Sequence, residues 1–224
     1  IKKQIEENPK AKVVCVKHSY PLLLSHGIKP WVCTILDPRP VTGLSTHGIV
    51  RTDLFKTVDP STLFLVAGMT DVSVTKLLIE KHAQIIGWHA YSEAVVNGVP
   101  DLAKDITWIT GGTNAAMRSV SIMHTLGFRD FKLHGFDFSL SEPPKDPEKL
   151  DEEGQKSFLK VNVDKESFWT TGELLAGAQD LEKFFDTRPK DITLSLHGEG
   201  LGGTLWKTNG SKKLSPNYKD VLYG

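Results

Sequence analysis

The sequence predicts an α/β fold, a doubly wound domain of about seven strands whose mostly parallel sheet has helices on both faces. Three observations predict this class. Short apolar runs recur along the chain, they are apolar on both faces, and turn or helix signals separate them. Strands that are covered on both faces have this pattern, whereas strands with one solvent-exposed face alternate apolar and polar residues. We expect one sheet from the runs at 12–16, 31–36, 63–67, 84–88, 106–109 and 131–134, with a further run at 192–196.

Helix signals lie between these runs. Residues 20–25 form a short helical connection, and residues 113–126 have the apolar spacing of a longer helix. Near the C-terminus, residues 174–185 place apolar side chains on one helix face. Capping residues mark where these helices begin and end. The caps that we expect are Thr70 or Asp71, the capping box of Thr170 with Glu173, and Gly127.

Two segments break this rhythm. Residues 38–59 show no clear period, and residues 139–168 are rich in charge and contain three prolines. A loop of this length is usually a lid or a binding loop. We expect residues 139–168 to be mostly irregular, with room for a small hairpin at 158–163, and to lie over the strand edge that carries Asp137. We treat residues 1–224 as a single domain in which 139–168 is a lid or an insertion.

Composition narrows the classes of function. The chain has 27 basic and 27 acidic residues, so a generic nucleic-acid or acidic-membrane surface is not indicated. It has no apolar stretch long enough to span a membrane and no recognisable signal peptide. Cys15 and Cys33 lie inside apolar runs, which predicts buried thiols in a reducing compartment. We therefore expect a cytoplasmic protein.

The stretch TGGTNAAMRS, residues 110–119, joins a predicted strand to a predicted helix through two glycines. Ligands of open α/β sheets bind where strands end, and the first N–H groups of a helix attract anions. The stretch matches neither GxGxxG nor GxxxxGK[ST], so a tight turn with a threonine cap is the alternative. The residues expected to hold a phosphate are Gly111, Gly112, Thr113 and Asn114, with Arg118 one helical turn further on.

Two carboxylates follow predicted strands. Asp37 ends the run at 31–36, and Asp137 follows the run at 131–134 and Gly135. Carboxylates at this edge can hold Mg²⁺ on a diphosphate or bind ribose hydroxyls. The alternative for each is an aspartate that only shapes a turn.

Histidines also occur near strand ends. None of them has the spacing of a known metal motif, so a metal cluster is not indicated. One of them acting as a general base is the better interpretation, because imidazole titrates near neutral pH. Spacing alone leaves open which one it is. The candidates are His18, His89, His134 and His197.

Three stretches resemble one family. They are residues 11–38 (AKVVCVKHSYPLLLSHGIKPWVCTILDP), residues 111–139 (GGTNAAMRSVSIMHTLGFRDFKLHGFDFS), and residues 168–185 followed by LSLHGEGLGGTLW. The family comprises bacterial flagellar motility accessory factors (Maf) and MptE-like 6-hydroxymethylpterin pyrophosphokinases. The resemblance implies a Rossmann-like domain related to sialyltransferases, with a nucleotide or nucleotide-sugar ligand at the strand edge. In the Maf branch, the implied reaction transfers a sialic-acid-like sugar to flagellin.

Family members usually begin with a glycine-rich GxGPSL loop, and residues 1–8 resemble the helix that follows it. The resemblance therefore implies an N-terminal strand and loop that this sequence lacks. An HGDN-type motif of archaeal pterin pyrophosphokinases is not found here either.

The sequence leads to a group transferase that binds a nucleotide. Glycosyl transfer from a CMP-sugar to a protein or glycan acceptor is the leading hypothesis. One alternative is a Mg²⁺-dependent diphosphokinase that uses ATP, and another is a nucleotide-binding module without turnover. The expected catalytic residues are His134 and Asp137. The expected binding residues are Asp37, Gly111, Gly112, Thr113, Asn114, Arg118 and Gly135.

Overall fold

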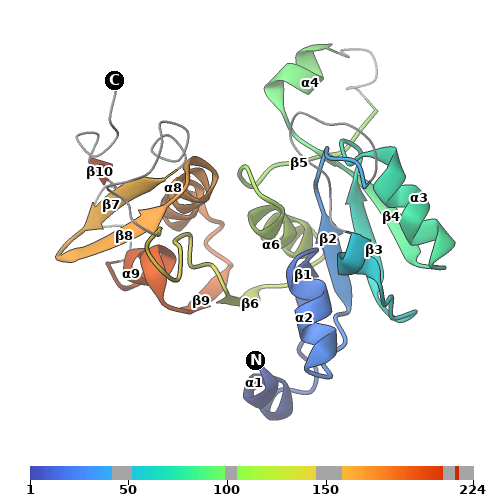
Figure 1. Ribbon diagram of the computed structural model, residues 1–224, viewed down its shortest axis with the longest axis horizontal. Coiled ribbons are helices and arrows are strands. Elements are labelled where there is room, and N and C mark those ends of the chain that lie inside the picture. The colour runs from blue at the N-terminus through green and yellow to red at the C-terminus, as the bar shows by residue number, and fades with distance from the viewer. Residues whose placement is uncertain (42–51, 99–104, 145–157, 209–214, 217–224) are drawn as a thin grey trace. The chain divides into compact units, whose positions relative to one another are not determined.

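The computed structural model describes residues 1–41, 52–98, 105–144, 158–208 and 215–216 (Figure 1). The chain divides into two compact units, and each is described by itself. Unit 1 comprises Ile1–Thr110 and Asn114–Met123, and unit 2 comprises Gly111–Thr113 and His124–Gly224. The expectation of a single domain stays a prediction.

Unit 1 contains a parallel sheet of five strands in the order β1-β2-β3-β4-β5, each hydrogen-bonded to the next along the chain. This confirms the predicted fold class. The two central strands β2 and β3 are buried almost throughout, as two-sided apolar runs predict. The strands are β1 (Val14–Val16), β2 (Val32–Ile35), β3 (Leu63–Ala67), β4 (Gln84–Ala90) and β5 (Trp108–Ile109).

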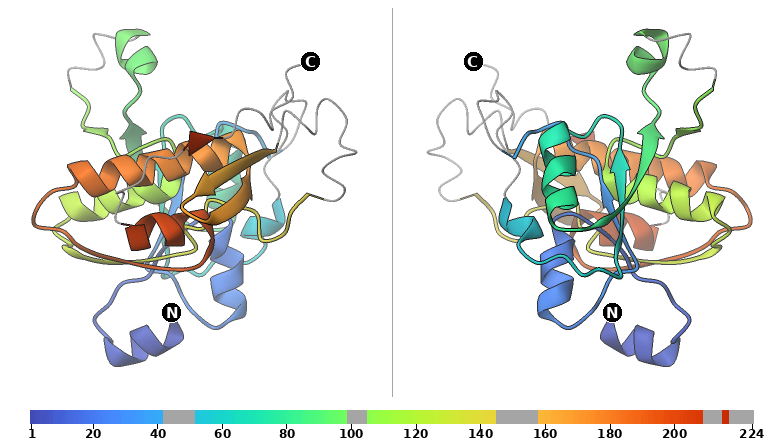
Figure 2. Two further views of the ribbon diagram at one scale, coloured as in Figure 1. Left: turned by 90° about the vertical axis from the view of Figure 1, so that its left-hand side faces the viewer. Right: turned by 90° about the vertical axis from the view of Figure 1, so that its right-hand side faces the viewer.

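Helices lie on both faces of this sheet. In Figure 2, α2 and α3 lie on one face and α6 lies on the other. The side of α2 and α3 holds an aromatic core, in which the Phe64 ring meets Tyr20 at 5.2 Å and Phe55 at 6.3 Å between centroids. Asp71 caps α3 by accepting the Ser73 N–H at 2.8 Å, as predicted. The helices in the described residues are α1 (Lys2–Glu7), α2 (Ser19–Ser25), the 3-10 turn η1 (Thr52–Phe55), α3 (Val72–Glu80), α4 (Glu93–Gly98) and α6 (Ala115–Thr125).

The two cysteines are free and buried, as predicted. Cys15 on β1 is the register partner of Cys33 on β2. Burial raises the pKa of the Cys33 thiol well above its usual value, and the neighbouring Cys15 raises it further. Both thiols therefore behave as core side chains.

Unit 2 contains two smaller sheets. Strands β6 and β9 pair in parallel, and β7 and β8 form an antiparallel hairpin that β10 extends. The described residues of this unit also form two helices, and no helix in the described ranges is both long and apolar enough to cross a membrane. The elements are β6 (Asp130–His134), β7 (Leu159–Val163), β8 (Glu166–Thr170), α8 (Gly172–Thr187), β9 (Thr193–His197), α9 (Gly200–Thr208) and β10 (Ser215–Pro216).

The structure corrects the prediction that the run at 131–134 joins the main sheet. This run forms β6, which pairs with β9 in unit 2. The physical reason is that burial alternates along β6. Phe131 and Leu133 are buried, whereas Asp130 and Lys132 are exposed. Such alternation belongs to a strand with one covered face, unlike the two-sided burial of β2.

A second correction concerns the start of α8. Thr170 belongs to β8, and its buried hydroxyl donates to Phe138 O at 2.9 Å. The next residue, Thr171, caps α8 by accepting the Leu174 N–H at 3.3 Å. The predicted capping box was therefore one residue out of register.

The described part of the excursion at 139–168 contains a hairpin that is longer than predicted. Its part at 145–157 lies outside the described residues, but most of the remainder forms the β7–β8 hairpin, which was expected only at 158–163. The Leu140 N–H donates to Trp169 O at 2.8 Å, so the hairpin lies beside the segment that carries Asp137. A lid function for this segment stays a prediction.

Candidate functional site

The carboxyl edge of the unit 1 sheet carries a buried charge cluster. Lys17 directly follows β1, and Asp37 follows β2 by two residues. Because the strands are parallel, their C-terminal ends meet at one edge, where α/β sheets bind ligands. Asp37 is 3% exposed and Lys17 is 8% exposed. Charged side chains are rarely this buried unless they are paired.

Asp37 meets two cations. Lys17 Nζ forms an ion pair with Asp37 Oδ2. Arg39 Nε donates to Oδ1 at 2.9 Å and Arg39 Nη2 donates to Oδ2 at 2.8 Å, which is the bidentate pairing of a guanidinium with a carboxylate. The Arg39 backbone N–H also donates to Oδ1 at 3.0 Å. These four donors fill the roughly four acceptor positions of a carboxylate.

The backbone around Asp37 is tied to the loop after β3. The Asp71 N–H donates to Asp37 O at 3.1 Å, and the Asp37 N–H reaches Thr70 Oγ1 at 3.5 Å. Two strand ends are thereby fixed to each other around the charge cluster. One carboxylate between two cations gives this three-residue cluster a net positive charge, which suits an anionic ligand.

The glycine turn expected to hold a phosphate contacts a carboxylate of the protein itself. Thr113 donates to Asp180 Oδ2 through its backbone N–H at 2.6 Å and its hydroxyl at 2.7 Å. Gly111 and Gly112 have φ values of 118° and 92°, which only glycine adopts easily. A Cβ on Gly112 would lie 2.8 Å from Asp180 Oδ2. Asp180 therefore takes the place in which we expected an anion, and phosphate binding here stays a prediction.

The other two members of this stretch have structural contacts. Asn114 Oδ1 accepts the Met117 N–H at 3.0 Å and so caps the first turn of α6. Arg118 donates through Nη2 to Tyr91 O at 2.9 Å and through Nη1 to Ile109 O. Its guanidinium thus ties α6 to the chain at the ends of β4 and β5. Ligand binding by Asn114 and Arg118 stays a prediction.

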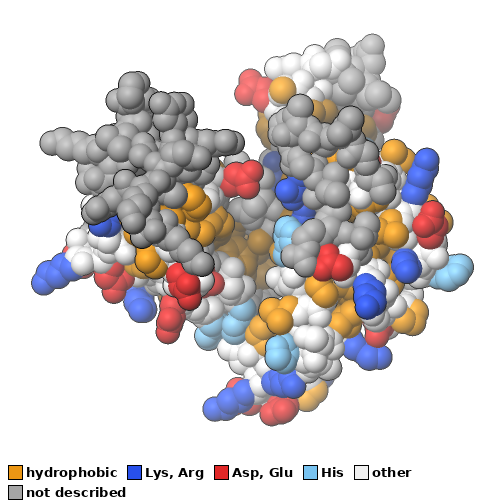
Figure 3. All heavy atoms as spheres, in the orientation of Figure 1, with side chains coloured by type: hydrophobic (Ala, Val, Ile, Leu, Met, Phe, Trp, Pro, Cys, Tyr) orange, Lys and Arg blue, Asp and Glu red, His pale blue; other side chains and the backbone are white. Residues whose placement is uncertain are grey.

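A pair of histidines lies at the carboxyl ends of β6 and β9 in unit 2. His134 and His197 are register partners, and their rings stack with centroids 4.8 Å apart and planes 13° apart. Figure 3 shows histidine side chains gathered over β6 and β9. Burial, and next the proximity of His197, lowers the pKa of His134. A lowered pKa favours the neutral imidazole, which is the form that can accept a proton.

Next to this pair, Ser195 Oγ lies 3.0 Å from His197 Nε2. Asp137 follows His134 by three residues and is exposed at its side chain. The Gly202 N–H donates to Asp137 O at 2.9 Å, so the Asp137 backbone anchors the start of α9. The roles expected for Asp137 and Gly135 stay predictions.

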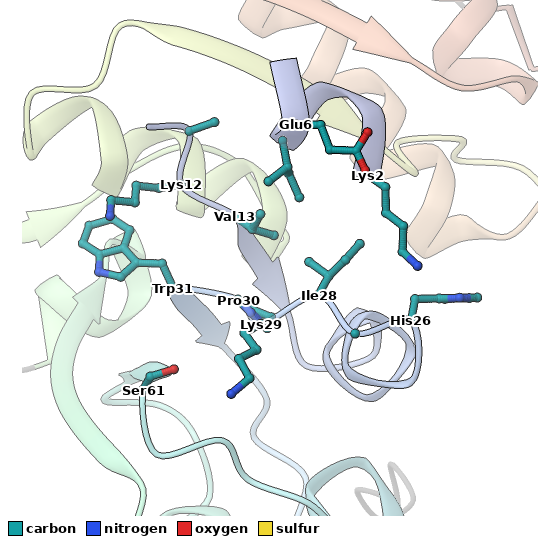
Figure 4. Close-up of a pocket in the computed structure, with 13 residues that line it drawn as sticks. Lys2, Glu6, Lys12, Val13, His26, Ile28, Lys29, Pro30, Trp31 and Ser61 are labelled. Carbon is teal, nitrogen blue, oxygen red and sulfur yellow. The ribbon is translucent and has the colours of Figure 1, made fainter. Parts of the chain in front are cut away.

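A cavity of about 540 Å³ opens at the opposite, amino edge of the unit 1 sheet (Figure 4). Lysines line it together with the Trp31 ring, over which Lys12 Nζ lies at 5.8 Å from the centroid. Another lining lysine, Lys29, pairs with Asp59 at 3.0 Å. The charge cluster at Asp37 is at the other edge, which is the usual ligand-binding edge of this architecture.

Sequence reasoning missed Lys17 and Arg39. Their signal was nevertheless present, because Lys17 follows the first predicted strand and Arg39 follows Asp37 by two residues. The structure brings both cations to Asp37 in unit 1, and it places His134, Gly135 and Asp137 in unit 2. In the described ranges, no three His, Cys, Asp or Glu side chains are grouped to hold a metal ion.

Residues 2–143 match the family model described as 6-hydroxymethylpterin diphosphokinase MptE-like, which is well over half of the chain. The chain belongs to the MptE-like family. The matched region includes the whole parallel sheet and the charge cluster of this MptE-like protein. Comparison with curated proteins and with solved structures gave no match. The relationship to Maf proteins and sialyltransferases stays a prediction.

Proposed function

We propose that this MptE-like protein is a diphosphoryl transferase that binds ATP at the carboxyl edge of the unit 1 sheet. The observation that carries the proposal is the charge cluster of Lys17, Asp37 and Arg39, which has two cations for one carboxylate and lies at the edge where α/β folds bind nucleotides. The family description supports the reaction type and the nucleotide. His134 and Asp137 stay the predicted catalytic residues.

The proposed chemistry follows from the family's substrate class. The hydroxymethyl oxygen of the acceptor forms a bond to the β-phosphorus of ATP. The bond between that phosphorus and the bridging oxygen on the α-phosphate breaks, and AMP leaves with the bridging oxygen. The hydroxyl proton passes to a general base. Because negative charge is redistributed over the phosphates, fixed cations are the main help that a protein gives to such a transfer.

Magnesium accompanies ATP in most such reactions and uses one or two carboxylates besides phosphate oxygens and water. Two carboxylates described at this edge of unit 1, Asp37 and Asp71, do not fit that role. Asp37 accepts from four donors, and Asp71 Oδ1 accepts from the backbone and the hydroxyl of Ser73. A Mg²⁺ requirement therefore stays a prediction, and no step is assigned to the ion here.

Glycosyl transfer from a CMP-sugar was the leading hypothesis from the sequence. The family match favours the alternative of a diphosphokinase instead. The CMP-sugar donor and the protein or glycan acceptor stay predictions. A module that binds nucleotide without turnover also stays a prediction. Such a module would bind ATP, as the proposed enzyme does, but would form no product.

The test combines an assay of products with a binding screen. The protein is incubated with ATP and 6-hydroxymethylpterin, and the nucleotides are separated by chromatography. AMP is expected, whereas ADP would mean transfer of a single phosphoryl group. In parallel, thermal shifts are measured with ATP, ADP, UDP and CMP, each with and without Mg²⁺, where a ligand at ~100 Kd adds ~2.7 kcal/mol. A shift with CMP alone, or no shift and no AMP with ATP, would overturn the proposal.

A further inference from the structure

We propose that Asp37 is a positioning residue, which holds Lys17 and Arg39 charged and aligned for the polyphosphate of the nucleotide. This inference rests on the proposed function at the same edge of the sheet. It assigns the binding of phosphate to the two cations and gives the carboxylate no contact with the ligand.

The first argument is the saturation of Asp37. Its two oxygens already accept from Lys17 and from three nitrogens of Arg39, so the cluster itself uses all of its acceptor capacity. A carboxylate would also repel a phosphate. A buried acid in this position therefore acts through the groups that it binds.

The second argument is the different exposure of the two cations. The Lys17 side chain is 10% exposed, so water solvates its charge poorly and the ion pair with Asp37 stabilises the charged form. The Arg39 side chain is 37% exposed and reaches the solvent. Nε and Nη2 of Arg39 are committed to Asp37, while Nη1 makes no hydrogen bond to the described part of the chain. A guanidinium fixed on one side in this way presents its remaining donors in a defined plane.

For the affinity of Asp37→Asn for ATP, this inference predicts the opposite of what the change in net charge alone predicts. Replacing Asp37 with Asn removes a negative charge, so charge counting predicts tighter binding of ATP. If Asp37 holds the cations, Asp37→Asn instead weakens ATP binding on the order of tenfold, which is the scale of one charge-assisted hydrogen bond. The loss should also grow as pH rises, because removing the negative charge beside a buried ammonium makes it easier for that ammonium to lose its proton.

The experiment is isothermal titration of ATP between pH 6.5 and 9 with the full chain. Parent protein and Asp37→Asn are compared with Arg39→Gln and with the matched control Asp59→Asn. Asp59 is an aspartate before β3 that pairs with Lys29 beside the amino-edge cavity. Arg39→Gln should weaken binding about tenfold at every pH, while Asp59→Asn should leave it unchanged.

The outcomes separate this inference from the proposed function. If the parent does not bind ATP, the proposed function fails. If the parent binds ATP and Asp37→Asn binds it equally well or more tightly, with the same pH dependence, the positioning role is overturned. If only Asp59→Asn changes the affinity, the nucleotide lies at the amino-edge cavity, which also overturns it. Should Asp37→Asn fail to fold by circular dichroism, Arg39→Gln decides, and an unchanged affinity in that variant contradicts the inference.

Discussion

Replacing Gly202 with Ala should strongly destabilise the protein. Gly202 is the third residue of α9, and its N–H donates to Asp137 O at 2.9 Å. A Cβ at this position would overlap Phe136 O and would lie 3.0 Å from Phe136 C and 3.1 Å from Phe138 Cδ2. The start of α9 thus packs directly on the chain after β6, and the absence of a side chain permits that contact.

The size of the effect follows from these distances. Carbon atoms normally approach to about 3.5–4.0 Å, so two of these contacts are short by roughly half an ångström, and the overlap with the carbonyl oxygen is worse. The two nearest obstacles are backbone atoms of Phe136, which cannot turn aside as a flexible side chain does. Overpacking costs about 1–3 kcal/mol, and we expect Gly202→Ala to lie at the upper end, near 3 kcal/mol. For a chain of this size, that lowers Tm by roughly 6–12 °C.

A matched control isolates the steric cause. Gly172 is the first residue of α8, and a Cβ there would have no atom within 4 Å. Alanine is the better helix former, so Gly172→Ala should leave stability unchanged or raise it by up to about 1 kcal/mol. Both variants are unfolded by heat and by urea beside the parent. A Gly202→Ala midpoint equal to that of the parent would refute the packing argument for this glycine.

Three further predictions concern single side chains. Thr34 Oγ1 is buried without a partner in the described ranges, so Thr34→Val should raise the free energy of unfolding by about 1 kcal/mol, and a lower urea midpoint would contradict this. Asp180→Ala should free the N–H of Thr113, and if the glycine turn is an anion site, titrated phosphate should bind more tightly; unchanged affinity would leave the turn purely structural. The pKa of His134 is lower in the folded chain, so the unfolded chain binds the proton more tightly and stability falls as pH drops below about 6.5. His134→Gln should reduce this loss between pH 7 and pH 5 in urea unfolding, and parallel curves for variant and parent would argue against it.

The parallel sheet of unit 1 was predictable from the sequence, because strands that are buried on both faces consist of nearly continuous apolar runs. Residues 31–36 and 63–67 are apolar nearly throughout, and they became β2 and β3. The error at residues 131–134 came from treating every apolar run alike. Alternating Asp130, Phe131, Lys132 and Leu133 already indicated a strand with one covered face, but nothing local indicated that its partner would be residues 193–197.

The charge cluster shows a different limit. Asp37 was predicted as a functional carboxylate from its place after a strand, yet its state depends on Lys17, which lies twenty residues earlier in the chain. Whether an acid is open to a ligand or saturated by the protein depends on distances of a few ångströms. Pattern and spacing place the residue at the edge, but they cannot determine which donors reach it.

The glycines show why a phosphate site is difficult to recognise from sequence alone. A phosphate near the backbone requires glycine for close approach and a helix N-terminus for its N–H groups. A carboxylate from elsewhere in the chain requires the same features, and Asp180 meets them at Gly112 and Thr113. A close-packed carbonyl imposes a similar demand, as Phe136 does at Gly202. The glycine pattern therefore indicates a close approach without indicating what approaches. In this chain the two glycine-rich turns contact the protein itself, whereas the unit 1 edge presents two cations that one carboxylate holds in place.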